Sequence, residues 1–182
     1  MIDPTDRDTR RGLLLNITGN GKGKTTGGLG ICLRALGWGW KVAVIQFVKS
    51  NRETGEKHFA DRVAMPLEFF TMGAGFSFTH PTEGQAHQEC AGRAFELAED
   101  YLIHGKADLL MLDELNIALD KGWMDKEKVI AALKNRPPCM HVIVTGRNAP
   151  PELLAASDLV SEIKELKHPY TAGIPAQPGI DF

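Results

Sequence analysis

Nine residues set the architecture of this chain: Thr18-Gly19-Asn20-Gly21-Lys22-Gly23-Lys24-Thr25-Thr26. They follow the apolar run Leu13–Ile17 and open a segment with helical spacing, so a buried strand, a glycine-rich turn and a helix N-terminus come together. Unpaired amides and the helix dipole at such a junction favour a negatively charged ligand. Lys24 adds a positive charge, and the hydroxyl of Thr25 suits a magnesium ion. The stretch predicts a site for a nucleoside triphosphate.

The candidate phosphate-binding residues are those of the turn and of the first helical turn. They are Gly19, Asn20, Gly21, Lys22, Gly23, Lys24, Thr25 and Thr26. The turn departs from the usual pattern G-x-x-x-x-G-K-[ST], because Thr18 stands where the first glycine belongs. A glycine-rich loop with incidental lysines is the alternative, and the Lys-Thr-Thr sequence between a strand and a helix argues against it.

Composition and charge exclude several classes of protein. Of the 182 residues, 43% are hydrophobic and 24% charged, which is typical of a folded chain. A formal charge of −2 offers no basic surface for nucleic acid. Cys32, Cys90 and Cys139 lie far apart, so we expect reduced thiols in a cytoplasmic protein, without disulfides or a zinc site. We expect neither a signal peptide nor a membrane span.

Short apolar runs recur between turn residues, as in strands buried on both faces of a parallel sheet. They are Leu13–Ile17, Val42–Val48, Leu67–Phe70, Leu109–Leu112, Val142–Val144 and Leu159–Ile163. Helices are expected at residues 25–36, 83–103 and 125–134, and after Pro150-Pro151. This alternation predicts a three-layer α/β domain with a mainly parallel sheet, similar to P-loop NTPases.

The remaining segments set the predicted domain boundaries. Residues 1–11 are polar and are expected to form a loose N-terminal tail, and residues 12–182 to form a single domain. Residues 49–65 and 72–81 show no regular pattern, and the prolines and glycines of residues 167–182 exclude a long helix. Such loops are expected at the carboxyl ends of the strands, where ligand sites of open α/β sheets lie.

Two carboxylates, Asp113 and Glu114, end the apolar run Leu109–Leu112. In phosphate-loop proteins an acidic strand end beside the loop holds magnesium. Successive strand residues point to opposite faces, so we expect one carboxylate to face the metal and the other to fix the loop or a helix. The alternative is that both simply end the strand and cap the next helix.

Several pieces of sequence together match one family. Besides Gly19–Thr26 and Leu112-Asp113-Glu114-Leu115, they are Val44-Ile45-Gln46-Phe47, Gly75-Phe76, Val144-Thr145-Gly146-Arg147 and Ala176-Gln177-Pro178-Gly179-Ile180-Asp181-Phe182. From about Gly12 to its C-terminus the chain resembles the P-loop type of ATP:corrinoid adenosyltransferase. The resemblance implies transfer of the 5′-deoxyadenosyl group of ATP to the Co(I) centre of a corrinoid, with release of triphosphate, in adenosylcobalamin synthesis or salvage.

The resemblance further implies that the triphosphate lies reversed in the loop. Cleavage between the 5′-carbon and its oxygen develops charge on the α-phosphate, and reversal brings the lysine and the metal to that charge. Lys24 becomes a candidate catalytic residue, and Thr25 with Glu114 the candidate ligands of Mg²⁺ or Mn²⁺. Arg34 and Arg147 are candidates for nucleotide contacts, the alternatives being a solvated helix surface and a loop ion pair.

The resemblance also assigns Phe76 and Phe78 to catalysis, where they press on the lower face of the corrin and expel the axial ligand of Co(II). Other members have tryptophan at the second position, so Phe78 is a departure. A hydrophobic loop anchor is the alternative for this segment. The N-terminal arm that covers the active site in some members is expected to be short or absent here.

ATP and a corrinoid are thus the expected partners, with a homodimer as the assembly and a transient flavoprotein as the electron donor. Neither nucleic acid nor a membrane is expected to bind. Two rival functions stay open: a hydrolytic P-loop ATPase or kinase, which would release phosphate or ADP, and a nucleotide- or corrinoid-binding protein without turnover. The sequence leaves the natural corrinoid undetermined.

Overall fold

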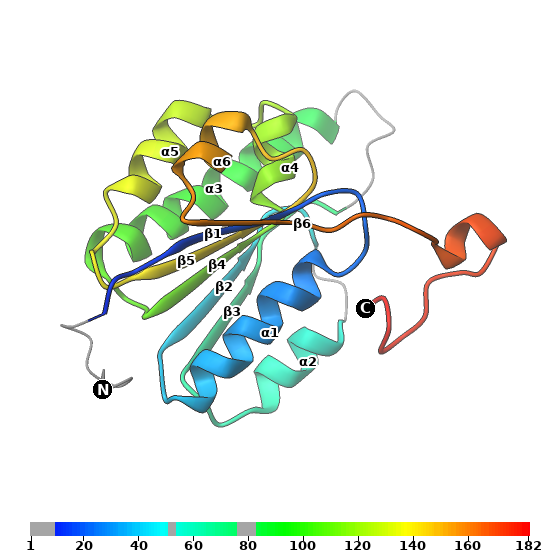
Figure 1. Cartoon of the computed structure of the whole chain (residues 1–182), viewed down its shortest axis with the longest axis horizontal. Helices are drawn as coiled ribbons and strands as arrows, with labels where there is room; N and C mark the ends of the chain where they lie inside the picture. Colours follow the sequence, from blue (N-terminus) through cyan, green and yellow to red (C-terminus); the bar gives the residue numbers. More distant parts are fainter. Residues whose placement is uncertain (1–9, 51–53, 76–82) are drawn as a thin grey trace.

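The structure, a computed structural model, describes residues 10–50, 54–75 and 83–182. Its centre is a six-stranded sheet in the order β3-β2-β4-β5-β1-β6, and every strand pair is parallel (Figure 1). The strands are β1 (Leu14–Thr18), β2 (Val42–Gln46), β3 (Leu67–Thr71), β4 (Leu109–Asp113), β5 (His141–Thr145) and β6 (Leu159–Glu162). All carboxyl ends therefore meet at one edge of the sheet.

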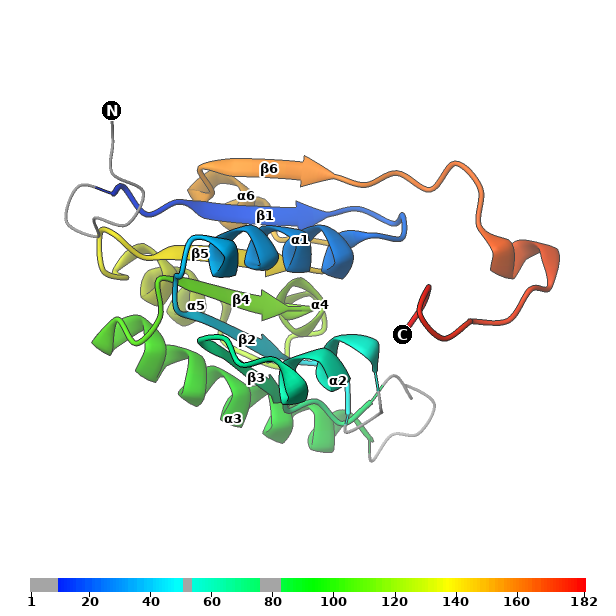
Figure 2. The same cartoon turned by 90° about the horizontal axis from the view of Figure 1, so that it is seen from below.

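Helices cover both faces of the sheet. On one face lie α1 (Lys24–Gly37) and α2 (Gly55–Arg62) (Figure 2). On the other lie α3 (Glu83–His104), α4 (Leu115–Asp120), α5 (Lys126–Lys134) and α6 (Pro151–Ala156). A short 3₁₀ helix, η1 (Pro169–Ala172), lies in the C-terminal segment. The three-layer α/β fold predicted from the sequence is confirmed.

The core is divided by the sheet into two layers. Leu110 and Leu112 of β4 pack with buried residues of α3 and α5, whereas Met111 faces α1 on the opposite side. A Cβ at Gly28 of α1 would lie 2.6 Å from the Met111 Cε, so the glycine lets α1 approach β4 closely. This close approach places the start of α1 beside the acidic end of β4.

All six predicted strands and all four predicted helices are present, and α2 and α4 are additional. Helix α2 has no buried residue, so it lacks the apolar stripe that periodicity detects. Its N-terminus is instead capped by Thr54, whose Oγ1 accepts a hydrogen bond from the Lys57 amide at 3.3 Å. Helix α4 has only six residues. Within the described residues, no helix combines the length and apolarity that a membrane crossing requires.

The chain is fastened to the sheet from Arg10 onward, within the stretch predicted as a polar tail. The Arg10 guanidinium lies 2.6 Å from Asp108 Oδ1 and 4.1 Å from the centre of the Trp40 ring. Asp108 directly precedes β4, so this contact lies at the amino edge of the sheet, opposite the phosphate loop. Arg10 therefore belongs to the folded part of the chain.

Candidate nucleotide site

The phosphate loop connects β1 to α1, and it requires glycines for two separate reasons, the backbone angles and close packing. Gly19 and Gly23 adopt positive φ angles of 97° and 116°, which favour glycine. Gly19 and Gly21 also pack against the segment that follows β6: a Cβ at Gly19 would lie 2.4 Å from the Ile163 carbonyl oxygen, and the Gly21 amide donates to that oxygen at 2.8 Å. These contacts explain why glycines alternate here while Thr18 completes the strand.

Lys24 is the first residue of α1 and is turned into the loop. Its Nζ donates to the Gly21 carbonyl at 2.7 Å, and the residue is only 7% exposed. Burial lowers the pKa of Lys24, and the negative charge of Glu114 acts in the opposite direction. The carbonyl oxygen is a neutral acceptor. A phosphate bound in the loop would give the Lys24 ammonium a negatively charged partner.

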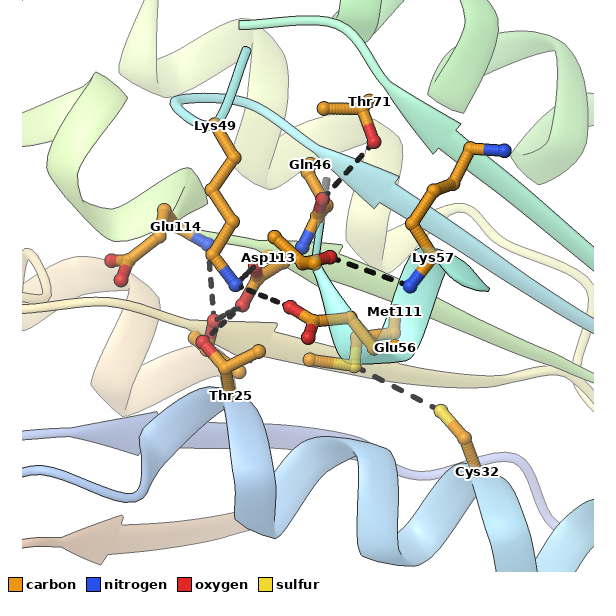
Figure 3. Close-up of polar contacts among 12 residues, drawn as sticks. Thr25, Cys32, Gln46, Lys49, Glu56, Lys57, Thr71, Met111, Asp113 and Glu114 are labelled. Carbon is orange, nitrogen blue, oxygen red and sulfur yellow. Dashed lines mark hydrogen bonds and ion pairs between the residues drawn. The ribbon is translucent and has the colours of Figure 1, made fainter. Parts of the chain in front are cut away.

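Asp113 is the centre of a buried polar cluster, and Thr25, Gln46 and Lys49 point toward it in Figure 3. Its Oδ1 accepts hydrogen bonds from the hydroxyls of Thr25 and Thr145, each at 2.8 Å. Its Oδ2 accepts from Gln46 Nε2 at 3.0 Å and lies 3.6 Å from Lys49 Nζ. The carboxylate is fully buried, so these donors replace the water that it loses.

Glu114 lies beside this cluster but points away from it, as Figure 3 shows. It has a φ of 63°, in the left-handed region, and its amide donates to Thr145 Oγ1 at 3.0 Å. Its Oε2 is buried without a hydrogen-bond partner among the described residues. Burial and the charge of Asp113 raise its pKa to about 7, against the effect of Lys24. A cation bound next to the Glu114 carboxylate would therefore stabilise its charged form.

The residues fit a magnesium ion bound mainly by phosphate oxygens. The described residues contain no group of three or more His, Cys, Asp or Glu side chains that could hold a metal. Mg²⁺ in nucleotide sites needs only one or two protein ligands besides phosphates and water. The predicted pair of ligands, Thr25 and Glu114, stays a prediction. The carboxylate in contact with Thr25 is Asp113, and the left-handed turn at Glu114 directs the side chain of Glu114 elsewhere.

Two residues of this site were missed by the sequence interpretation, Gln46 and Lys49. Gln46 ends β2 with 1% of its surface exposed and joins Asp113 to Thr71, whose Oγ1 donates to Gln46 Oε1 at 3.2 Å. Lys49 follows the same strand and donates to Glu56 Oε1 at 2.9 Å. A polar residue at the end of an otherwise apolar strand was the available signal.

The C-terminal segment returns to the phosphate loop. Lys22 Nζ lies 2.7 Å from Asp181 Oδ1, and Asp181 Oδ2 accepts from the Gln177 amide at 2.8 Å. The Lys22 side chain is 39% exposed, in contrast to the buried Lys24. The two lysines of the loop thus occupy different environments, and Lys22 already has a carboxylate partner.

The other predicted residues divide into those near the loop and those away from it. Asn20 and Thr26 are exposed on the loop and on the first turn of α1. Arg147 follows Gly146, whose carbonyl accepts from Asn116 at 3.0 Å, and its charge affects the pKa values of Lys24 and Glu114. Arg34 is exposed in the last turn of α1.

Arg34 lies away from the phosphate loop, and its predicted nucleotide contact stays a prediction. Ten residues of helix separate it from Lys24, which corresponds to about 15 Å along the axis, so the fold does not bring Arg34 to the phosphate loop of the same chain. Phe76 and Phe78 lie outside the described residues, and their predicted roles stay predictions.

Comparison with known proteins accounts for this combination of features. The family model "ATP:corrinoid adenosyltransferase BtuR/CobO/CobP" matches residues 10–182. The chain belongs to this family. It is 41% identical over 172 residues to the corrinoid adenosyltransferase of Pseudomonas aeruginosa, covering 94% of this chain and 84% of that protein. It is 38% identical over 173 residues to the corrinoid adenosyltransferase of Escherichia coli K12, covering 94% and 86%.

A solved structure shares the parallel-sheet fold of this chain. The flagellar accessory protein FlaH from Methanocaldococcus jannaschii superimposes with a TM-score of 0.54, covering 84% of this chain and 71% of that one. The two sequences are 10% identical, so this similarity concerns the fold alone.

Proposed function

We propose that the protein transfers the 5′-deoxyadenosyl group of ATP to the Co(I) centre of a corrinoid and releases triphosphate. The observation that carries the proposal is the family match over residues 10–182, which includes the phosphate loop and the acidic end of β4. The structure supports it with a buried lysine in the loop, Lys24, and with Thr25 held by Asp113. Both groups would face a polyanion bound at the start of α1.

Lys24 would stabilise the leaving triphosphate. The bond that breaks joins the 5′-carbon to the α-phosphate oxygen, so the electron pair of that bond passes to the triphosphate. The Lys24 ammonium would leave the neutral Gly21 carbonyl and contact the negatively charged triphosphate. Because Lys24 is buried from water, the attraction between the two charges is stronger than it would be at the surface. Gly19 to Thr26 would hold the phosphates, and Arg147 would add a positive charge at their exposed side.

Mg²⁺ or Mn²⁺, when bound, would neutralise part of the charge that develops on the triphosphate. We propose Thr25 and Glu114 as its protein contacts. Asp113 would act on Thr25, orienting its hydroxyl through the 2.8 Å hydrogen bond. The unpartnered Oε2 of Glu114 supports this assignment, because a nearby cation would compensate its buried charge.

On the corrinoid side, we propose that Phe76 and Phe78 cover the lower face of the corrin. Gly73 and Gly75, just before them, are the last described residues of this segment and lie at the carboxyl edge of the sheet. Further parts of the proposal are a homodimer, a transient flavoprotein as reductant, a cytoplasmic location and one catalytic domain over residues 12–182. The natural corrinoid is left open by all of these.

The test is a single anaerobic reaction. The protein is mixed with ATP, Mg²⁺ and chemically reduced cobalamin, and the products are analysed for a photolabile Co–C bond and for triphosphate. Equal amounts of both are expected. Release of orthophosphate instead would identify a hydrolase, and binding of both substrates without product would identify a binding protein.

A further inference from the structure

Strand β1 carries two polar side chains on a face that is otherwise part of the apolar core. Leu14 belongs to the core layer on the side of α3 and α5. Asn16 and Thr18 follow it at alternate positions, so all three side chains point to the same side of the sheet. Asn16 is fully buried. A buried amide costs free energy unless its polar atoms are hydrogen-bonded, so its partners must explain why it stands here.

Asn16 pairs with Asn116 of α4, which is equally buried. Asn16 Nδ2 donates to Asn116 Oδ1 at 3.2 Å, and Asn116 Nδ2 donates back to Asn16 Oδ1 at 3.0 Å. The same Asn116 Nδ2 donates at 3.0 Å to the carbonyl oxygen of Gly146, the residue that follows β5. Both N–H bonds of the Asn116 amide are therefore used, and one of them ties α4 to the loop after β5.

The loop after β5 is held on both sides of its arginine, Arg147. Before it, Gly146 has a φ of 128°, and a Cβ there would lie 2.9 Å from the Asn116 Cβ, so the loop backbone packs directly against α4. After it, the Ala149 amide donates to Thr18 Oγ1 at 3.4 Å. The two polar residues on this face of β1 thus serve the same loop, and their contacts determine where Arg147 leaves it.

Arg147 is placed where its charge reaches the nucleotide site. The Glu114 carboxylate lies beside the anchored glycine, because a Cβ at Gly146 would lie 3.1 Å from Glu114 Oε2. Burial raises the pKa of Glu114, and the charge of Arg147 acts against this effect. Burial lowers the pKa of Lys24, and the charge of Arg147 adds to it. A charge that acts on Lys24 would also act on phosphates bound in the loop.

We propose that Asn116 is a positioning residue for the reaction, because its amide holds Gly146 and thereby keeps Arg147 directed at the phosphates. The inference rests on the proposed function, since it takes the phosphates of ATP to occupy the loop between β1 and α1. Asn116 then acts on ATP only through Arg147. Loss of the Asn116 amide weakens ATP binding, and this effect disappears when the Arg147 side chain is already absent.

The experiment is a double-mutant cycle on the affinity for ATP. Calorimetric titration with ATP and Mg²⁺ is carried out without a corrinoid, so that no group is transferred. We expect Arg147→Ala to raise the dissociation constant about tenfold, because it removes a charged contact to phosphate. Asn116→Ala should raise it about fivefold. The double variant should stay within about twofold of Arg147→Ala, whereas independent effects would multiply to about 50-fold and overturn the proposal.

Asn16→Ala is the matched control, because it removes the same amide–amide contact but leaves the Asn116 donor on Gly146. Both single variants should lower the urea midpoint, since each leaves one buried amide without its partner. Only Asn116→Ala should change the ATP affinity by more than about twofold. A merely structural pair would give equal changes in affinity for the two variants, and that result would refute the positioning role.

Inorganic triphosphate with Mg²⁺ is the second probe. The same cycle should give the same ratios as with ATP, whereas a loss confined to ATP would place Arg147 at the nucleoside and contradict the proposal. If Asn116→Ala does not fold, Asn16→Leu combined with Asn116→Leu replaces it. This pair of changes leaves neither amide unpaired but still removes the donor to Gly146, so the affinity must again fall about fivefold.

The outcomes separate this inference from the proposed function. Failure of the wild-type protein to adenosylate preformed Co(I) cobalamin would refute the function, whatever the binding cycle gives. An active wild-type protein whose single changes multiply in the double variant would refute only the role of Asn116. An unchanged affinity of Arg147→Ala for both probes would equally refute that role.

Discussion

The carboxyl edge of the sheet has two halves that are held very differently. Around β1, β4 and β5, the functional side chains Lys24, Asp113 and Thr145 are buried and hydrogen-bonded. Around β3 and α2, β3 is only partly buried and α2 has no buried residue. The first half is preorganised for a small polyanion. The second half has fewer buried contacts, which suits a broad ligand that must be admitted and released.

Lys24→Ala tests the first half, around β1, β4 and β5, and should have the largest effect of the changes considered. Loss of a buried cation aimed at the leaving charge is expected to lower turnover at least about 100-fold. Lys22→Ala in the same loop is the control, because Lys22 is partly exposed and paired with Asp181, and it should cost less than about tenfold. Initial rates of Co–C bond formation measure both, and similar losses would show that burial does not distinguish the two lysines.

Asp113→Ala tests whether the first half also stabilises the fold. The change would leave Lys49 and two threonine hydroxyls without their common acceptor, and should destabilise the protein by about 3 kcal/mol. Urea unfolding gives the free energy. Asp61→Ala removes an exposed ion pair on α2 and should cost less than about 1 kcal/mol. Equal costs would remove the proposed difference between the halves.

Phe76→Ala tests the second half. If Phe76 has its proposed role, expulsion of the axial ligand comes before reduction, so the variant should slow the reaction by about tenfold or more when the corrinoid is supplied as Co(II). With preformed Co(I), the rate should change little. The two rates are compared in parallel anaerobic assays, and an equal loss with both forms would contradict the aromatic role.

Glu114→Gln should change how the stability of the first half depends on pH. The folded protein holds the Glu114 proton up to a pKa of about 7, whereas the unfolded chain loses it near 4.5. The free energy of unfolding should therefore fall as pH rises from about 4.5 to 7, by up to about 3 kcal/mol from this group. The glutamine variant should lack this part of the slope, which urea titrations at several pH values measure.

Glu127→Gln, at an exposed position of α5, is the control for that titration. It should reproduce the wild-type slope. If both glutamine variants retained that slope, burial of Glu114 would not be the cause of its raised pKa.

The strands, helices α1, α3, α5 and α6, and the phosphate loop could be predicted, because continuous apolar runs and turn residues depend directly on burial and on local turn chemistry. Helix α2 could not, because its residues are largely solvated. The alternation of Asp113 and Glu114 predicted that the two side chains point in different directions, as they do, but not which one contacts Thr25, since the turn at Glu114 is a tertiary feature. The contacts of Lys49 join segments far apart in sequence and leave no local pattern.

The two chain ends have unequal value for protein engineering. At Arg10 the chain is fastened to Asp108 and Trp40, at the edge of the sheet remote from the nucleotide site. Near the C-terminus, Asp181 forms an ion pair with Lys22 of the phosphate loop. An affinity tag or a fluorescent fusion joined after Phe182 would therefore start beside the phosphate loop, whereas Arg10 lies at the opposite edge of the sheet.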